Sequence, residues 1–125
     1  MEQREPILSV RFFRTPNGQE PVLEWLLGLR ERDRKTVGRD IKTAQFGWPL
    51  GMPLIRKLEA GLWEIRSNLT AGVARVVFTV EGRTMVLLHA FTKKSRKTPT
   101  GDLITARQRL SQLRGSECQE WSNED

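Results

Sequence analysis

Four short hydrophobic runs in the second half of the chain restrict the fold more than any other feature. They cover Leu54 to Leu58, Leu62 to Ser67, Val73 to Val80 and Thr84 to Phe91. A glycine-containing turn separates each run from the next, at Ala60-Gly61, Ala71-Gly72 and Glu81-Gly82. Runs of this length, joined by turns this short, are typical of antiparallel strands. The sequence therefore predicts an antiparallel meander over residues 54–91.

The first half of the chain adds one strand and two helices to this prediction. A hydrophobic run over residues 7–14 ends at a Thr-Pro-Asn-Gly turn, as expected of a buried first strand. Pro21 suits the first turn of a helix, and the apolar residues that follow it at helical spacing are Val22, Trp25, Leu26 and Leu29. Asp33 is expected to cap a second helix that ends at Gly47, with an apolar stripe of Val37, Ile41 and Ala44.

The last periodic segment predicts a C-terminal helix. Its apolar positions are Leu103, Ala106, Leu110 and Leu113, and Thr98, Pro99 or Thr100 can begin it. The fold class is therefore α+β, with an antiparallel sheet, an N-terminal helical hairpin packed on one face and a C-terminal helix. We expect a single domain over residues 1–114, followed by an acidic, disordered tail over residues 115–125.

Positive charge is concentrated in the predicted domain. The whole chain has a net charge of +6, but residues 1–114 hold 21 basic and 11 acidic side chains, a net charge of +10. Such a surplus favours nucleic acid as the partner class, the alternative being a charged surface without a specific partner. Residues 1–10 lack the apolar core of a signal peptide, and no apolar run is long enough to cross a bilayer. We therefore expect a cytoplasmic protein that contacts no membrane.

Alternation along the predicted strands places charged side chains on one face of the sheet. In the run from residue 62, Glu64 and Arg66 point to one side, whereas Trp63 and Ile65 point to the other. Arg75 in the next run faces the same side as Glu64 and Arg66 if the two strands pair in a suitable register. These three residues are then expected to share one surface.

The last run ends in further basic residues. His89 is expected to share a face with Leu87 and Phe91, and Lys93 and Lys94 follow directly at the end of the strand. The two lysines therefore belong to the same basic cluster as the arginines of the neighbouring strands.

Four motifs carry a resemblance to a known family. They are LWEIR over residues 62–66, ARVVF over residues 74–78, LLHAFTKK over residues 87–94 and TPTGDLITAR over residues 98–107. In this order and spacing they resemble the RelE/HigB-like toxins of bacterial type II toxin-antitoxin modules, and within the RelE/ParE superfamily the phage-derived, HigB-type branch. The resemblance covers residues 7–110 and implies a RelE-like fold.

This resemblance implies a metal-independent mRNA endoribonuclease that acts on the ribosome, inhibits translation and needs no cofactor. In that reaction the 2'-hydroxyl of the RNA attacks the adjacent phosphate and a 5'-hydroxyl is released, which requires a base, positive charge on the phosphorane oxygens and an acid. Arg75 matches the arginine of the family's central strand, and Arg66, Lys94 and Lys93 match its neighbouring basic positions. Arginine suits this role because its planar fork binds phosphate in a bidentate manner. The alternative for each is a solvated surface cation.

The identity of the proton acceptor stays open at this point. Glu64 stands where several relatives use a lysine, so it either accepts a proton or pairs with the arginines, and pairing is the favoured role. His89 has the right chemistry for proton transfer, but a histidine inside a hydrophobic strand is more often a core residue. Lys57 is a further candidate, and the residues predicted to bind RNA are Arg56, Lys57, Arg96 and Lys97.

The chain departs from the family in having no tyrosine, which several relatives place near the last helix. The aromatic residues that can replace it in stacking on a base are Trp48, Trp63 and Phe91. Trp63, however, is predicted to face the core, where an aromatic residue at strand spacing usually packs.

Two other functions fit the same basic surface. A ParE-like toxin would bind and poison DNA gyrase without cleaving RNA, and a degenerate toxin would bind RNA without cleaving it. The arginine and lysine set favours the nuclease. The resemblance also implies two partners, mRNA on the ribosome and a cognate antitoxin with a helix-turn-helix fold that is encoded by the adjacent gene.

Overall fold

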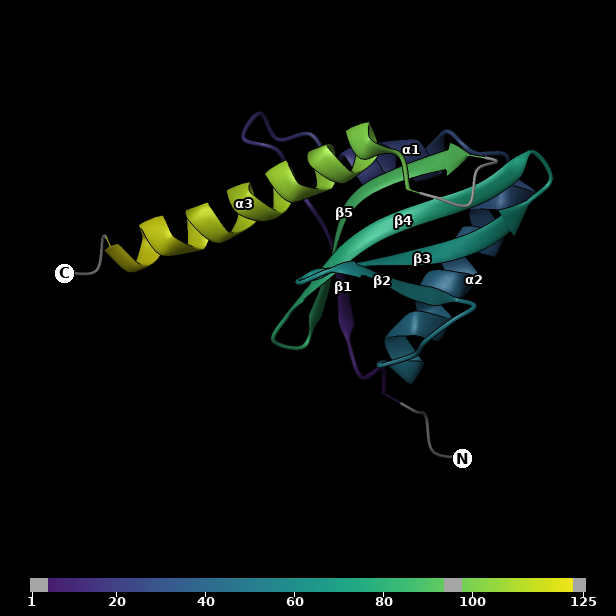
Figure 1. The fold of residues 1–125 in the computed structure, drawn as a ribbon, viewed down its shortest axis with the longest axis horizontal. Helices are drawn as coiled ribbons and strands as arrows, with labels where there is room; N and C mark the ends of the chain where they lie inside the picture. The colour runs from purple at the N-terminus through teal and green to yellow at the C-terminus, as the bar shows by residue number, and fades with distance from the viewer. Residues whose placement is uncertain (1–4, 94–97, 123–125) are drawn as a thin grey trace.

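The computed structural model describes residues 5–93 and 98–122, and for residues 116–122 only the course of the helix. Strands and helices follow one another in the predicted order (Figure 1). Their bounds are β1 Ser9–Phe12, α1 Pro21–Leu27, α2 Glu31–Gly47, β2 Ile55–Glu59, β3 Leu62–Leu69, β4 Gly72–Glu81, β5 Thr84–Lys93 and α3 Thr100–Ser122. None of the helices in these residues is both long and apolar enough to cross a membrane.

The sheet has five strands in the order β1-β5-β4-β3-β2. The strands β2 to β5 form the predicted antiparallel meander, and Gly61 and Gly82 adopt positive φ values of 81° and 61° in two of its turns. The strand β1 pairs with β5 in parallel, which makes the whole sheet mixed. This pairing joins residues far apart in the sequence, so local patterns of hydrophobicity do not reveal it.

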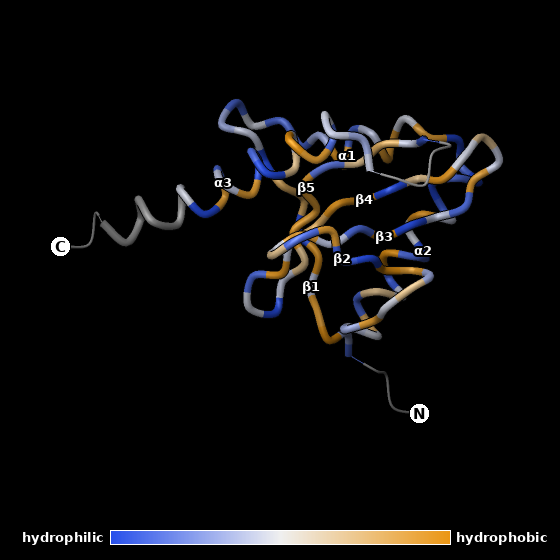
Figure 2. Tube along the Cα trace, in the orientation of Figure 1, coloured by the Kyte–Doolittle hydropathy of each residue, from blue (hydrophilic) through white to orange (hydrophobic). Residues whose placement is uncertain are grey.

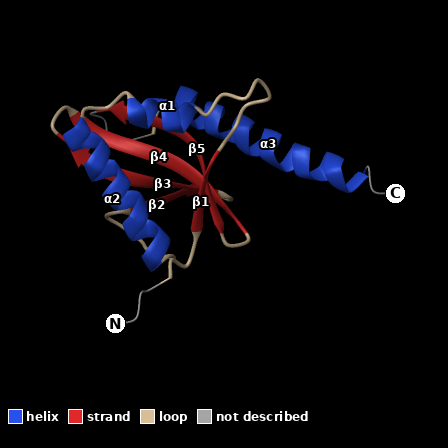
Figure 3. Ribbon diagram, turned by 180° about the vertical axis from the view of Figure 1, so that it is seen from behind, coloured by secondary structure: helices blue, strands red, loops and turns tan. Residues whose placement is uncertain are grey.

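The helices cover both faces of the sheet, as Figures 1 and 3 show from opposite sides. On one face α1 and α2 enclose a core that includes Val22, Val37, Ile41, Ile65 and Phe78. On the other face α3 packs through Ala106, Leu110 and Leu113 onto Leu62, Val77 and Leu88. Hydrophobic residues gather where the strands cross the middle of the molecule (Figure 2). The α+β class and the C-terminal helix are therefore confirmed.

Two local predictions differ from the structure at the ends of helices. The helix α2 begins at Glu31, so Asp33 lies in its first turn, where its charge favours the helix dipole, and does not cap it. The helix α3 continues to Ser122, past Gly115 where the sequence predicts a disordered tail to begin. Extending an existing helix fixes one residue for each new hydrogen bond, and residues 116–122 contain no proline that would stop it.

A β-bulge in β5 changes the direction of its side chains halfway along the strand. Val77 pairs with His89, but Phe78 pairs with Leu87, so Leu88 is an extra residue without a partner in this register. Leu87 therefore packs against α1 and α2, whereas Leu88 and Phe91 pack toward α3. The expectation that His89 and Leu87 share a face was wrong, because alternation holds only in a regular strand. His89 is thereby turned to the same face as Arg75.

Candidate nucleic-acid site

The basic residues of β3 and β4 lie next to one another on the face that α3 partly covers. Arg66 pairs directly with Arg75 across the two strands, and Arg75 pairs with Phe91 of β5. One row further along, Glu64 lies between Arg56 of β2 and Val77 of β4. Residues paired across strands point to the same face. The register therefore confirms that Glu64, Arg66 and Arg75 share one surface.

Arg75 occupies the centre of this cluster and is 0% exposed to solvent. Burial lowers the pKa of its guanidinium, the nearby Glu64 carboxylate raises it, and Arg66 and Arg56 lower it through charge repulsion. An arginine remains charged under such shifts because its ordinary pKa is very high. Its Cζ atom lies 5.9 Å from the centre of the Phe91 ring, within the range of a cation–π contact. The sequence thus places a buried positive charge at the middle of the sheet.

Glu64 supplies the negative charge that this burial requires. Its side chain is 0% exposed, and its Oε1 atom lies 4.0 Å from Nε of Arg66. Its Oε2 atom accepts a hydrogen bond of 3.0 Å from the Thr98 hydroxyl, whereas Oε1 accepts none within the described part of the chain. A buried carboxylate is stable only beside positive charge or hydrogen-bond donors. The arrangement supports the predicted role of Glu64 as a partner of the arginines.

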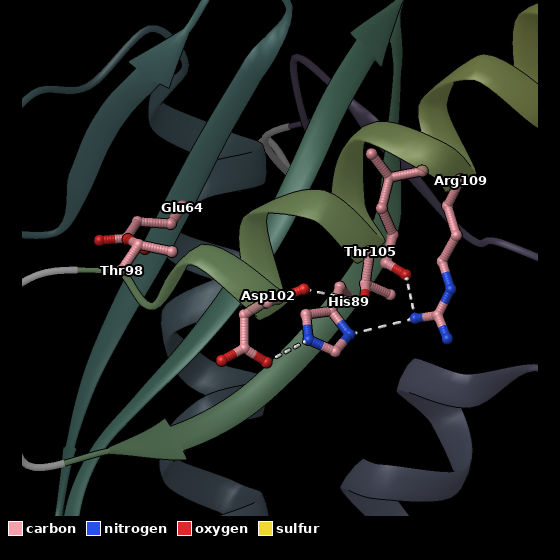
Figure 4. A network of polar contacts seen from close by, with 8 residues as sticks. Glu64, His89, Thr98, Asp102, Thr105 and Arg109 are labelled. Carbon is pink, nitrogen blue, oxygen red and sulfur yellow. Dashed lines mark hydrogen bonds and ion pairs between the residues drawn. The ribbon is translucent and has the colours of Figure 1, made fainter.

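His89 is held at both ring nitrogens by residues of α3, as Figure 4 shows. Nε2 lies 2.7 Å from Oδ1 of Asp102, and Nδ1 lies 3.1 Å from Nη1 of Arg109, which also donates to the Leu88 carbonyl at 2.8 Å. A guanidinium only donates hydrogen bonds, so Nδ1 must accept and the ring proton sits on Nε2, facing Asp102. With both nitrogens occupied, His89 is a linker between β5 and α3 in this state.

Asp102 and Arg109 were not predicted as site residues, although their spacing in the sequence indicates that they share one side of a helix. They stand seven residues apart in α3 and therefore lie on one side of the helix, two turns from each other. Burial lowers the pKa of the Arg109 guanidinium. What the sequence does not contain is the bulge that turns His89 toward this side of α3.

The remaining predicted residues divide between the two faces of the sheet. Arg56 lies on the face of the arginine pair and is half-buried. Lys57 pairs with Trp63 and lies on the opposite face, its Nζ atom 5.9 Å from the centre of the Trp63 ring. Lys93 is exposed and pairs with Val73, two residues from Arg75 on β4. The other predicted basic residues, Lys94, Arg96 and Lys97, lie outside the described residues.

Of the aromatic residues considered for base stacking, only Phe91 lies on this face. Trp48 and Trp63 contact each other edge to face at a centroid distance of 5.2 Å and pack on Phe78 in the core beneath α2. Phe91 is 7% exposed, and its ring lies 5.6 Å from that of His89. Trp48 and Trp63 therefore serve the core, as aromatic residues at strand spacing usually do.

Comparison with known proteins places the chain in a family. A search of curated proteins gives no match. The family model described as Phage derived protein Gp49-like (DUF891) matches residues 24–111, a segment that runs from α1 into α3 and contains the arginine pair, Glu64, His89 and Asp102. The match spans more than half of the chain. The chain therefore belongs to the phage-derived Gp49-like family, a family of RelE-like, toxin-like proteins of toxin-antitoxin systems.

Proposed function

We propose that this protein is a HigB-type toxin that cleaves mRNA on the ribosome without a metal ion and so inhibits translation. The observation that carries the proposal is the direct pairing of Arg66 with Arg75 across β3 and β4, with Arg56 on the next strand of the same face. Guanidinium groups on adjacent strands can bind one phosphate together, which suits a reaction whose transition state gathers negative charge on phosphate oxygens.

In the proposed reaction the ribose 2'-oxygen forms a bond to phosphorus, and the bond from phosphorus to the 5'-oxygen breaks. The products are a cyclic phosphate and a 5'-hydroxyl, which takes up the proton that the 2'-hydroxyl loses. Arg66, with a side chain that is 19% exposed, contacts the phosphate first. Arg75 has no exposed surface, so neighbouring side chains must move before it joins Arg66. Lys93, at the exposed end of β5, binds the RNA backbone nearby.

Glu64 acts in this proposal as a positioning residue. Its carboxylate is buried beside Arg66 and accepts a hydrogen bond from Thr98, so it fixes the orientation of the arginine side chains around it. We expect the proposed antitoxin to cover the surface around Arg66 and Arg75. It should have a helix-turn-helix fold and be encoded next to this gene.

The decisive experiment compares RNA cleavage by the purified protein and its Arg75 variants in a translating extract. Arg75→Ala and Arg75→Lys should each lower the cleavage rate by about 10² or more, because Lys keeps the charge but lacks the bidentate fork. Arg83→Ala removes an exposed arginine on the turn between β4 and β5 and should leave cleavage unchanged. Added EDTA should not lower the cleavage rate, except where it damages the ribosome. A second nuclease that is known to need no metal ion, tested in the same extract, measures that damage.

The ends of the RNA fragments distinguish this function from the alternatives. Cuts within codons that leave 5'-hydroxyl ends support the proposal. DNA breakage in the presence of gyrase with intact RNA would replace it with a gyrase poison, and retention of RNA without any cut would leave a binding module. Full cleavage by Arg75→Ala would refute the assignment of this site.

A further inference from the structure

A second group of basic residues lies on α2, on the other side of the sheet from the arginine pair. Arg32, Lys35, Arg39 and Lys42 follow one another at intervals of three or four residues and are all exposed. This spacing keeps side chains on one side of a helix. The opposite side of α2 is buried through Val37, Ile41 and Ala44. We call the four cations the α2 stripe.

Three of the four cations of the α2 stripe, Arg32, Arg39 and Lys42, have no ion pair among the described residues. Glu31 pairs with Lys35 at 3.0 Å, at the beginning of the helix. Asp40 accepts a hydrogen bond of 2.7 Å from the Ser67 hydroxyl of β3 and is thereby turned toward the sheet. Like charges three or four residues apart in a helix destabilise it, and Arg39 and Lys42 form such a pair without an acidic partner among the described residues. An anionic ligand would remove this repulsion.

A groove at the C-terminal end of the stripe adds to the surface. It has a volume of about 490 Å³ and is lined by Arg39, Lys42, Thr43, Phe46, Gly47 and Leu50. The stripe therefore ends at a hollow that is lined by two of its cations and by the apolar side chains of Phe46 and Leu50. The distance along the helix from Arg32 to Lys42 is about 15 Å, which spans several phosphates of a nucleic-acid duplex.

We propose that the α2 stripe binds the phosphate backbone of double-stranded RNA, independently of sequence. It does not share a face with the arginine pair, so the duplex it binds is a different RNA segment from the strand that reaches Arg66 and Arg75. The charge of the stripe suits any polyanion, and the inference rests on the proposed function only in naming RNA as the one that it binds. Charge on a helix face, without side chains that read bases, fits the shape-based recognition of duplex RNA.

The test measures binding of a short RNA duplex by fluorescence anisotropy at a series of salt concentrations. All proteins carry Arg75→Ala, so cleavage plays no part. In one variant Lys35, Arg39 and Lys42 are replaced by Ala, and in the matched control Arg11, Arg14 and Arg83 are replaced by Ala. The control residues are also exposed, lie away from α2 and remove the same charge. Alanine favours helix, so α2 should persist, which circular dichroism checks.

The α2 variant should bind the duplex at least tenfold more weakly, and the slope of log affinity against log salt should fall by about 2 to 3, at about 0.9 for each lost phosphate contact. The control should keep the slope of the parent protein. An equal loss in both variants, or an unchanged slope in the α2 variant, would overturn the inference; the second result would leave an acidic protein as the partner of the stripe. If the protein binds the duplex through α2 but the protein with Arg75 intact cuts no mRNA, the proposed nuclease function is refuted and the duplex-binding inference is kept.

Discussion

At the scale of single residues, the site is built around a buried charge and not around an open cleft. Arg75 pairs with Arg66 across the strands, is attracted by the charge of Glu64 and lies within cation–π range of the Phe91 ring. The Arg75 guanidinium is already desolvated, so a phosphate that reaches it does not have to displace water from it, although neighbouring side chains must move first. The same burial makes the charge of Glu64 necessary for the fold.

Replacing Glu64 by Gln should separate the positioning role from proton transfer. Gln keeps the size of the side chain but leaves two arginines without their counter-charge, so we expect the free energy of unfolding to fall by about 3 kcal/mol or more, as for a broken buried pair. Cleavage by the folded fraction should fall less than tenfold. A loss of 10² to 10⁴ in rate with unchanged stability would instead identify Glu64 as the general base. Urea denaturation and single-turnover cleavage supply the two measurements.

Replacing Arg109 by Ala should uncouple α3 from β5. The change removes the donor to the Leu88 carbonyl and to Nδ1 of His89, and each group left without a partner costs about 1 to 3 kcal/mol. Gln108→Ala, at an exposed neighbouring position of α3, should change stability by less than about 0.5 kcal/mol. Equal melting temperatures for the two variants would contradict the linker role of His89. The imidazole signals in an NMR spectrum should shift only in Arg109→Ala.

At the scale of elements, the sequence predicts each strand and helix but not how the two faces of β5 are assigned. Alternation correctly separates Trp63 and Ile65 from Glu64 and Arg66, because β3 is regular there. It fails at Leu87 and His89, because the pattern of hydrophobic residues contains no mark of the inserted Leu88. The parallel pairing of β1 with β5 was likewise beyond local patterns. The spacing of Asp102 and Arg109 places them on one side of α3, but only the docking of α3 on β5 shows that this side meets His89.

The docking of α3 onto β2 should depend on pH through Glu59. Arg107 donates hydrogen bonds of 2.9 and 3.1 Å from Nε and of 2.7 Å from Nη2 to this carboxylate and thereby lowers the pKa of Glu59 below its ordinary value of 4.5. A carboxylate with a lowered pKa in the folded state stabilises the protein above its unfolded-state pKa, and this contribution is lost as the pH falls through the folded-state value.

The variant Arg107→Gln should therefore be less stable than the parent protein at neutral pH, and the difference should shrink once the pH falls below 4.5. Arg83→Gln is the control, since this exposed arginine has no carboxylate within salt-bridge distance among the described residues. Melting temperatures over a range of pH give the comparison. A gap between Arg107→Gln and the parent that stays constant down to low pH would contradict the role of Glu59.

At the scale of the whole molecule, the net charge of residues 1–114 is positive, whereas the net charge of residues 115–125 is negative. The arginine pair and the α2 stripe lie on opposite faces, and residues 1–114 carry a net charge of +10. Residues 115–125 contain Glu117, Glu120, Glu124 and Asp125 and no basic residue. Acidic residues attached to a basic domain compete with RNA for it at low salt, where the range of electrostatic interactions is longest.

Removal of residues 115–125 should therefore strengthen RNA binding without loss of the fold. The last side chain of α3 that packs in the described core is Leu113, which is 8% exposed, so the shortened chain keeps every contact of that core. Its affinity for RNA should rise severalfold at low salt, and the two proteins should converge as salt shortens the Debye length from about 30 Å toward 8 Å. A second variant, with the four acidic residues changed to their amides, keeps the length of the chain and should reproduce the gain, because the effect is one of charge. If only the shortened chain binds RNA more tightly, residues 115–125 obstruct RNA by their bulk. If all three proteins bind RNA equally, the acidic residues do not act on the basic faces.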